Sequence, residues 1–207
     1  RLEISRVSGV RDRRRAAAFA SGGVVSRAGK LSGRPLRGTL AVPLWLPFAA
    51  EVLRANLLAS ADALWDAWPV EIALADTIGV GVPWQVQQTF EALGNLAGDV
   101  PMRAHFHDTR NTGIGNAYGS LLAGVTTLDA SIGGIGGCPF APNASGNIAT
   151  EDLVYMLNRS EVHHDLAMQP LLEGAAWLEP LLGKRLPSML LKAGDWPTAS
   201  AEQLSIT

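Results

Sequence analysis

The stretch VPMRAHFHDTRNTGIGNAYGSLLAGVTTLDASI, residues 100–132, carries the pattern that decides the fold. Short apolar runs predict strands over residues 100–108 and 126–132, and the segment between them predicts a helix over 115–123. Two apolar strands joined through a helix are typical of a βαβ unit, in which both strands run parallel. This stretch therefore predicts an α/β fold.

The same alternation of strands and helices continues on both sides of this unit. The other expected elements are strands over residues 36–46 and 70–76 and helices over residues 48–68, 83–96, 150–158 and 166–182. Thr150 is expected to cap the helix that follows it, with Asp152 in the first turn. About four strand–helix units make roughly half of a (β/α)8 TIM barrel of about 250 residues. Composition alone leaves a complete small open α/β sheet as the alternative.

Charge is distributed unevenly along the chain, which has 207 residues and a formal net charge of −2. The first 37 residues hold ten Lys and Arg against Glu3 and Asp12. Such a basic arm is typical of a nucleic-acid contact, an organelle transit peptide or an exposed lead segment. No aromatic residue interleaves with the arginines of residues 11–15, which argues against nucleic acid.

We therefore divide the chain into three parts. Residues 1–35 form a basic, irregular lead segment, a degenerate N-terminal part of the barrel. Residues 36–195 form the C-terminal part of the barrel domain, and residues 196–207 form a tail. A single cysteine excludes an intrachain disulfide and a Cys-rich zinc site. No apolar run approaches the roughly 18 residues of a membrane span.

Polar side chains follow the strands at their expected carboxyl ends, where α/β folds place their chemistry. Asp76 ends one strand, and His105 and His107 end another. A spacing of two puts both imidazoles on one face of a strand, where they could hold a divalent metal or be two hydrogen-bonded histidines. Adjacent His163 and His164 diverge in any regular structure, so we expect them at the surface.

A Gly-rich loop, GGIGGCPFAPNASGN over residues 133–147, follows the last expected strand. Its glycines permit tight or left-handed backbone close to a ligand. Cys138 lies in this polar loop rather than on an apolar stripe, so its thiol could act as an acid or base, or be part of a hinge. Asn147 offers an amide oxygen, a ligand that suits Mg²⁺ or Mn²⁺, or a turn residue.

The stretch over residues 71–158 closely resembles the 3-hydroxy-3-methylglutaryl-CoA lyases, a branch of the metal-dependent lyase and aldolase barrels. The matching motifs are EIALADTIGVGVP, HFHDTRNTG and the loop GGCPFAP…SGN…ATED. Sister synthases and aldolases share the His-x-His strand but lack this loop. The resemblance implies a partial (β/α)8 TIM barrel with lyase activity.

The resemblance also implies a role for each matching residue. A divalent cation, Mg²⁺ or Mn²⁺, would be held by His105, His107 and Asn147. Cys138 would exchange a proton with the enolate carbon of the departing acetyl-CoA. Asp76 would assist proton transfer from the 3-hydroxyl, with His105 adding to that relay. Glu151 would steady the loop around Asn147.

The implied reaction is a retro-Claisen cleavage of 3-hydroxy-3-methylglutaryl-CoA to acetoacetate and acetyl-CoA, a step of leucine degradation and ketone-body formation. It requires that a tertiary hydroxyl be deprotonated and that an enolate be protonated. A divalent cation chelated by the hydroxyl and a substrate carboxylate would serve the first need. Closure of the Gly-rich loop would serve the second by placing Cys138 and excluding water.

The N-terminal third departs from the family pattern. The Arg–Asp pair of the family's first strand has no convincing copy, because Arg11–Asp12 follows no apolar strand. The initial RLEIS resembles the remains of the family's second strand. Without an anionic ligand, we expect weak Mg²⁺ binding. Two alternatives therefore remain: an inactive lyase-family fragment, or a lyase for a related branched 3-hydroxyacyl-CoA.

The resemblance implies an acyl-CoA substrate as the partner, and we expect neither a nucleic-acid nor a membrane partner. A complete barrel of this family is expected to form a homo-oligomer. We expect a cytoplasmic protein, with the mitochondrial matrix as the alternative.

Overall fold

The computed structural model describes residues 2–7, 36–41, 71–137 and 146–196. The chain divides into two compact units, each described here by itself. The first comprises Arg1–Ala130 and Gly136–Ile148, and the second comprises Ser131–Ile135 and Ala149–Thr207. The helix expected over residues 48–68, the Arg11–Asp12 dipeptide and Cys138 lie outside the described residues.

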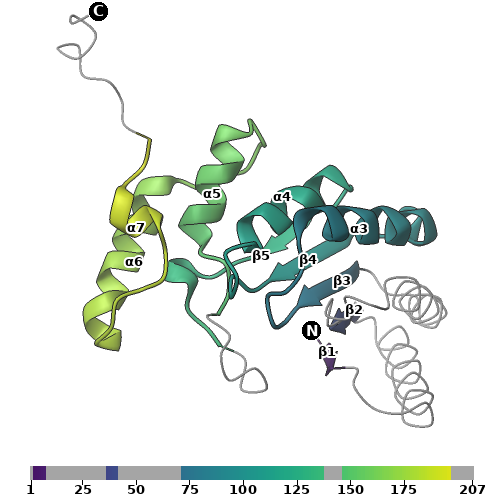
Figure 1. The fold of residues 1–207 in the computed structure, drawn as a ribbon, viewed down its shortest axis with the longest axis horizontal. Helices are drawn as coiled ribbons and strands as arrows, with labels where there is room; N and C mark the ends of the chain where they lie inside the picture. The colour runs from purple at the N-terminus through teal and green to yellow at the C-terminus, as the bar shows by residue number, and fades with distance from the viewer. Residues whose placement is uncertain (1, 8–35, 42–70, 138–145, 197–207) are drawn as a thin grey trace, which may run out of the picture. The chain divides into compact units, whose positions relative to one another are not determined.

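The first unit contains a five-stranded parallel sheet whose strands follow one another in chain order (Figure 1). The strands are β1 (Leu2–Val7), β2 (Leu36–Ala41), β3 (Glu71–Asp76), β4 (Met102–Phe106) and β5 (Thr127–Asp129). All four strands expected from residue 36 onward are present, and β1 overlaps the RLEIS stretch, whose sequence resembles the remains of a strand. Sequential parallel order is that of a (β/α)8 barrel, whereas a doubly wound open sheet reverses its order. The predicted α/β fold with a partial barrel is confirmed.

Two helices of this unit, α3 (Pro83–Ala97) and α4 (Gly113–Leu122), pack on one another, and α4 also contacts β4 (Figure 1). Pro83 is the first residue of α3, where its fixed φ and missing N–H suit a helix start. The apolar stripe of α3, with Val86, Phe90 and Leu93, is buried. A Cβ at Gly119 would lie 2.8 Å from the carbonyl oxygen of Pro83, so this glycine permits close packing of the two helices.

Alternate residues of β4 serve two different faces of the sheet. Met102, Ala104 and Phe106 are buried, whereas Arg103 and His105 between them are half-buried. Neighbouring residues of parallel strands point to the same face, and the register pairs the residue before Asp76 with His105 and Asp76 itself with Phe106. The face of β4 with Phe106 is therefore a core surface that is apolar apart from Asp76 at the end of β3, and the other face bears Arg103 and His105.

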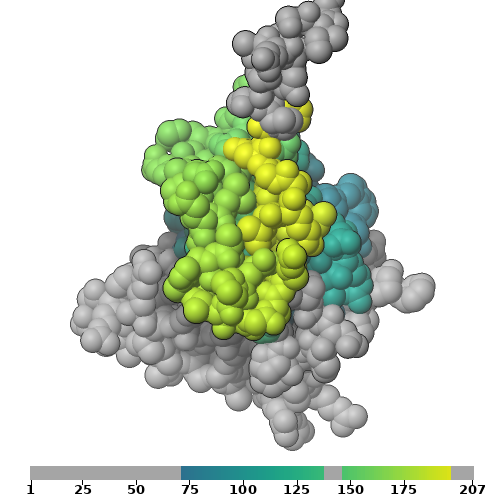
Figure 2. Space-filling model, turned by 90° about the vertical axis from the view of Figure 1, so that its left-hand side faces the viewer, coloured from purple at the N-terminus to yellow at the C-terminus, as the bar shows by residue number. Residues whose placement is uncertain are grey.

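The second unit consists of the 3-10 turn η1 (Ile132–Gly134) and the helices α5 (Thr150–Arg159), α6 (Met168–Leu182) and α7 (Leu190–Ala193). Figure 2 shows α7, in yellow, lying against α6, in yellow-green. The expectation that Thr150 caps α5 is wrong, because Ala149 is the N-cap and Thr150 is the first helical residue. Asp152 lies in the first turn as expected, and its carboxylate accepts hydrogen bonds from the N–H groups of Met189 and Leu190.

Candidate metal centre

Two histidines lie together at the carboxyl end of β4. The ring centroids of His105 and His107 are 5.3 Å apart, so the predicted pairing of the imidazoles is confirmed. His107 is only 5% exposed, and its Nδ1 is buried without a hydrogen-bond partner among the described residues. A buried nitrogen without a partner is costly, and a metal ion is one ligand that would remove this cost.

The environment of His107 favours the neutral imidazole. Burial lowers the pKa of His107, and the neighbouring His105 lowers it further, while the negative charge of Asp76 opposes both. A neutral imidazole has a free nitrogen lone pair, which is the form that binds a metal. The structure therefore keeps His107 in its ligand form at neutral pH.

Asn147 reaches the same place from the far end of the Gly-rich loop. Backbone hydrogen bonds from Asp108 N to Gly146 O (3.0 Å) and from Ile148 N to Phe106 O (3.2 Å) hold this segment against the end of β4. As a result, His107 and Asn147 face one another in an isolated antiparallel bridge. The structure thus places Asn147 beside His107, which in turn lies beside His105; the sequence alone could only suggest this arrangement.

Gly136 fits closely beside the Asn147 side chain. Its φ is +103°, and a Cβ built there would lie 2.8 Å from Asn147 Nδ2. Gly136 O also accepts a hydrogen bond from Asn147 N (3.2 Å). Only glycine meets both requirements without strain, so Gly136 helps to set the position of the Asn147 amide.

The donor chemistry fits part of a divalent metal site. Two imidazoles and an amide oxygen suit Mn²⁺ and, less well, Mg²⁺, which prefers carboxylates and water. Across residues 71–137 and 146–196, no group of three or more His, Cys, Asp or Glu side chains is placed to hold a metal ion. His105, His107 and Asn147 could supply a neutral set of three ligands. The His107 Nδ1, which has no hydrogen-bond partner in the part of the chain that the structure describes, supports this fit.

An ionic network lies on the same face of the sheet and was missed by the sequence analysis. Arg103 Nε donates to Glu71 Oε2 (2.9 Å), and Arg103 Nη1 donates to Asp129 Oδ1. The other carboxylate oxygen of Asp129 lies 3.6 Å from His105 Nδ1. The available signal was an arginine two residues before His105, because a spacing of two along a strand places both side chains on one face.

Mutual contacts keep this network charged. Burial by itself would raise the pKa of the Asp129 carboxyl, but His105 and Arg103 outweigh burial and hold that pKa below its ordinary value. Burial opposes the charge of Arg103 as well, and the two carboxylates raise the pKa of its guanidinium above the ordinary value. The network therefore presents an ionised carboxylate to His105.

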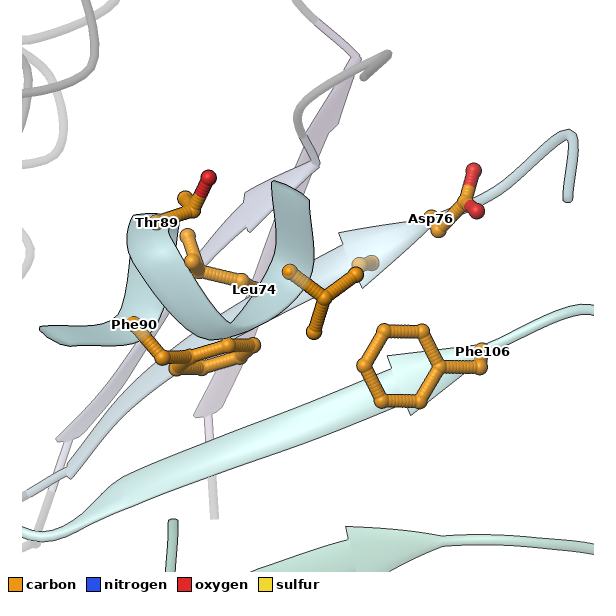
Figure 3. Close-up of a pocket in the computed structure, with 7 residues that line it drawn as sticks. Leu74, Asp76, Thr89, Phe90 and Phe106 are labelled. Carbon is orange, nitrogen blue, oxygen red and sulfur yellow. The ribbon is translucent and has the colours of Figure 1, made fainter. Parts of the chain in front are cut away.

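Asp76 binds the turn that follows β3. Its carboxylate accepts hydrogen bonds from Val80 N (3.0 Å) and Gly81 N (2.8 Å), and the residue is 1% exposed. Figure 3 shows Asp76 at the end of its strand, on the side where Phe106 and Phe90 line a small pocket beneath α3. Because this pocket is lined mainly by apolar side chains, it belongs to the core.

Residues after β4 hold the same turn from the other side. Arg110 Nη1 donates to the carbonyl oxygens of Ile78 (3.1 Å) and Gly79 (3.0 Å), and the buried Asn116 donates to Gly81 O (2.9 Å). Asp108 accepts a hydrogen bond from Gly113 N (2.7 Å), so it caps the turn into α4. The turn over residues 77–82 is thus fixed at both ends.

Glu151 and the remaining histidines lie in the second unit. The carboxylate of Glu151 is fully buried and accepts hydrogen bonds from Gly133 N at 3.0 and 3.1 Å. It therefore holds the turn η1, at the start of the Gly-rich loop. His163 is exposed and His164 is half-buried, in agreement with the expected surface position of His163 and, more weakly, of His164.

No helix among the described residues is long and apolar enough to cross a membrane.

Comparisons with known proteins identify the family of this chain. The HMGL-like family matches residues 38–177. The hydroxymethylglutaryl-CoA lyase YngG of Bacillus subtilis is 39% identical over 156 residues, which are 75% of this chain and 52% of that protein. The (R)-citramalyl-CoA lyase of Chloroflexus aurantiacus is 42% identical over 148 residues, which are 72% of this chain and 47% of that protein.

A solved structure agrees with these relatives. An HMG-CoA lyase from Acinetobacter baumannii, determined with coenzyme A and 3-methylmalate, matches with a TM-score of 0.80 and 32% identity. The match covers 89% of this chain and 60% of that chain. This protein belongs to the HMGL-like family, as the sequence motifs predicted. The chain spans about half the length of the curated relatives it matches.

Proposed function

We propose that this chain carries the metal-binding part of a carbon–carbon lyase that cleaves 3-hydroxy-3-methylglutaryl-CoA to acetoacetate and acetyl-CoA. The observation that carries the proposal is the juxtaposition of His105, His107 and Asn147 at the carboxyl end of β4. His107 has a buried nitrogen without a partner among the described residues, and its environment keeps it neutral. Family membership supplies the reaction class.

In this proposal, His105, His107 and Asn147 hold a divalent cation, Mg²⁺ or Mn²⁺. When bound, the cation would lower the pKa of the substrate hydroxyl and orient the bond to be broken. Asp76 would accept the hydroxyl proton, and its negative charge opposes the lowering of the pKa of His107. His105, whose Nε2 would bind the cation, would assist this relay only through its Nδ1–H. The hydrogen bonds of Asp76, Arg110 and Asn116 to the turn over residues 77–82 would keep the carboxyl end of β3 rigid.

The remaining proton transfer is assigned to Cys138. As the carbon–carbon bond breaks, its electron pair becomes the enolate of acetyl-CoA, and the hydroxyl carbon becomes the ketone carbon of acetoacetate. The Cys138 thiol would protonate the enolate carbon. Glu151 would keep the loop in place through its hydrogen bonds to Gly133, at the start of that loop.

A related branched 3-hydroxyacyl-CoA is the alternative substrate. The relative named (R)-citramalyl-CoA lyase is as similar to this chain as the hydroxymethylglutaryl-CoA lyases are. The coenzyme A complex of the A. baumannii structure supports an acyl-CoA substrate in either case.

We further propose a cytoplasmic location, because relatives such as that of B. subtilis are bacterial. Homo-oligomer formation stays a prediction for the complete barrel.

The direct experiment is to incubate the purified chain with each acyl-CoA and Mn²⁺ or Mg²⁺, and to measure release of the ketone product. The expected result is metal-dependent release that is lost in His107→Ala and Cys138→Ala and retained in the surface variant His163→Ala. A folded chain that binds Mn²⁺ but releases no product from either substrate would contradict the proposed activity. It would leave an inactive member of the family.

A further inference from the structure

The carboxylate of Asp129 connects the ionic network to the candidate metal centre. Asp129 ends β5 directly beside His105 of β4 in the parallel register. One of its oxygens accepts from Arg103 Nη1, and the other lies 3.6 Å from His105 Nδ1. The carboxylate is therefore divided between a guanidinium and one particular nitrogen of the imidazole.

The same carboxylate is itself held in place. Arg103 is 18% exposed and binds Glu71, whose side chain is 10% exposed, through a 2.9 Å hydrogen bond. Glu71, Arg103 and Asp129 belong to three successive strands, β3, β4 and β5. Because backbone hydrogen bonds fix the strands, the direction from which Asp129 approaches His105 is fixed as well.

The position of Asp129 beside Nδ1 affects which nitrogen of His105 carries the proton. A neutral imidazole carries one proton, and a carboxylate beside Nδ1 favours the tautomer with the proton on that nitrogen. The lone pair then lies on Nε2, which becomes the nitrogen available to a metal. Carboxylate partners of this kind orient metal-bound histidines and raise their basicity.

We propose that Asp129, held by Arg103 and Glu71, is a positioning residue that keeps His105 in the Nδ1–H tautomer with Nε2 free for a ligand. The inference rests on the proposed function, because the ligand is the divalent cation of that site. The competing explanation is that Asp129 merely neutralises Arg103. In that case the tautomer of His105 would not depend on Asp129.

The test is nitrogen NMR of the full chain labelled with ¹⁵N-histidine, without metal, at a pH of about 8.5 where imidazoles are neutral. The chain has only four histidines, so His→Gln variants can assign each ring. In the unmodified chain we expect His105 as the Nδ1–H tautomer. An Nε2–H tautomer there would overturn the proposal without any mutation at Asp129.

The second arm compares Asp129→Asn with Asp165→Asn. Asp165 lies 3.8 Å from His163, but both side chains are more than nine-tenths exposed, so this pair is a matched control. Asp129→Asn is expected to shift His105 toward the Nε2–H form and to weaken Mn²⁺ binding about 10–100-fold. Asp165→Asn should change neither property. An unchanged His105 spectrum in a folded Asp129→Asn chain would overturn the proposal.

Metal binding and tautomer are separate readouts, so the two proposals can fail separately. If the unmodified chain binds no Mn²⁺ while the tautomer depends on Asp129, the metal centre is refuted and the positioning role stands. If Mn²⁺ binds with equal affinity to both chains and the tautomer does not change, the positioning role is refuted and the metal centre stands.

Discussion

The two faces of β4 differ in what their side chains do. On one face, Met102, Ala104 and Phe106 are buried among apolar neighbours and stabilise the fold. On the other face, Arg103 and His105 contact carboxylates, and His107 beyond them has a buried nitrogen without a partner among the described residues. Both faces are built from one short sequence, MRAHFH, because strand side chains alternate. Stability and chemistry can therefore be changed separately by substitutions one residue apart.

Phe106→Ala should have the largest effect on stability. The side chain is 2% exposed and lines the contact with α3, so its loss leaves a cavity that costs about 3–5 kcal/mol of unfolding free energy. Chemical denaturation measures this change, and substitution of the exposed Trp84 by Ala is the control. A loss below 1 kcal/mol would contradict the assignment of Phe106 to the core.

Gly136→Ala should affect the site more than the fold. The added methyl group would approach Asn147 Nδ2 to 2.8 Å at a φ of +103°, so we expect a loss of about 1–3 kcal/mol and about tenfold weaker Mn²⁺ binding. Gly137→Ala is the matched control, since a Cβ there meets nothing within 4 Å. Calorimetry with Mn²⁺ compares the two variants. Equal Mn²⁺ affinities of the two variants would show that Asn147 does not bind the metal.

A fall in pH should have the smallest of these effects on the stability of the chain. Burial and His105 lower the pKa of His107, so the folded chain binds this proton more weakly than the unfolded chain does. The contribution of His107 to stability should therefore be constant above its unfolded pKa of about 6.5, and it should decrease as the pH falls below that value. Thermal melting of the metal-free chain between pH 7 and 5, compared with His107→Gln, isolates this contribution. Identical pH profiles would show that His107 does not contribute.

The fold could be predicted from the sequence because each strand is a short apolar run and each run is followed by helical periodicity. Residues 70–76 and 83–96, for example, correspond to β3 and α3 within one residue at each end. The N-cap of α5 was misplaced at Thr150, because capping propensity is weaker than the backbone hydrogen bonding that begins the helix after Ala149.

The site was only partly predictable. The pairing of His105 with His107 follows from a period of two, but their approach to Asn147 depends on the path of a loop that periodicity does not describe. The roles of Glu71 and Asp129 also depend on strand register, which brings residues 26 and 32 positions from Arg103 into contact with it. Asp76 was expected beside the metal; the register pairs it with Phe106, its carboxylate binds the following turn, and its negative charge opposes the lowering of the pKa of His107.

The central claim is that the end of β4 binds a divalent cation. The most direct measurement is the thermal unfolding of the full chain with increasing Mn²⁺, compared between the unmodified chain, His107→Ala and the exposed-site control His163→Ala. We predict that Mn²⁺ raises the melting temperature of the unmodified chain and of His163→Ala but not that of His107→Ala. No rise in the unmodified chain, or an equal rise in all three, would contradict the account.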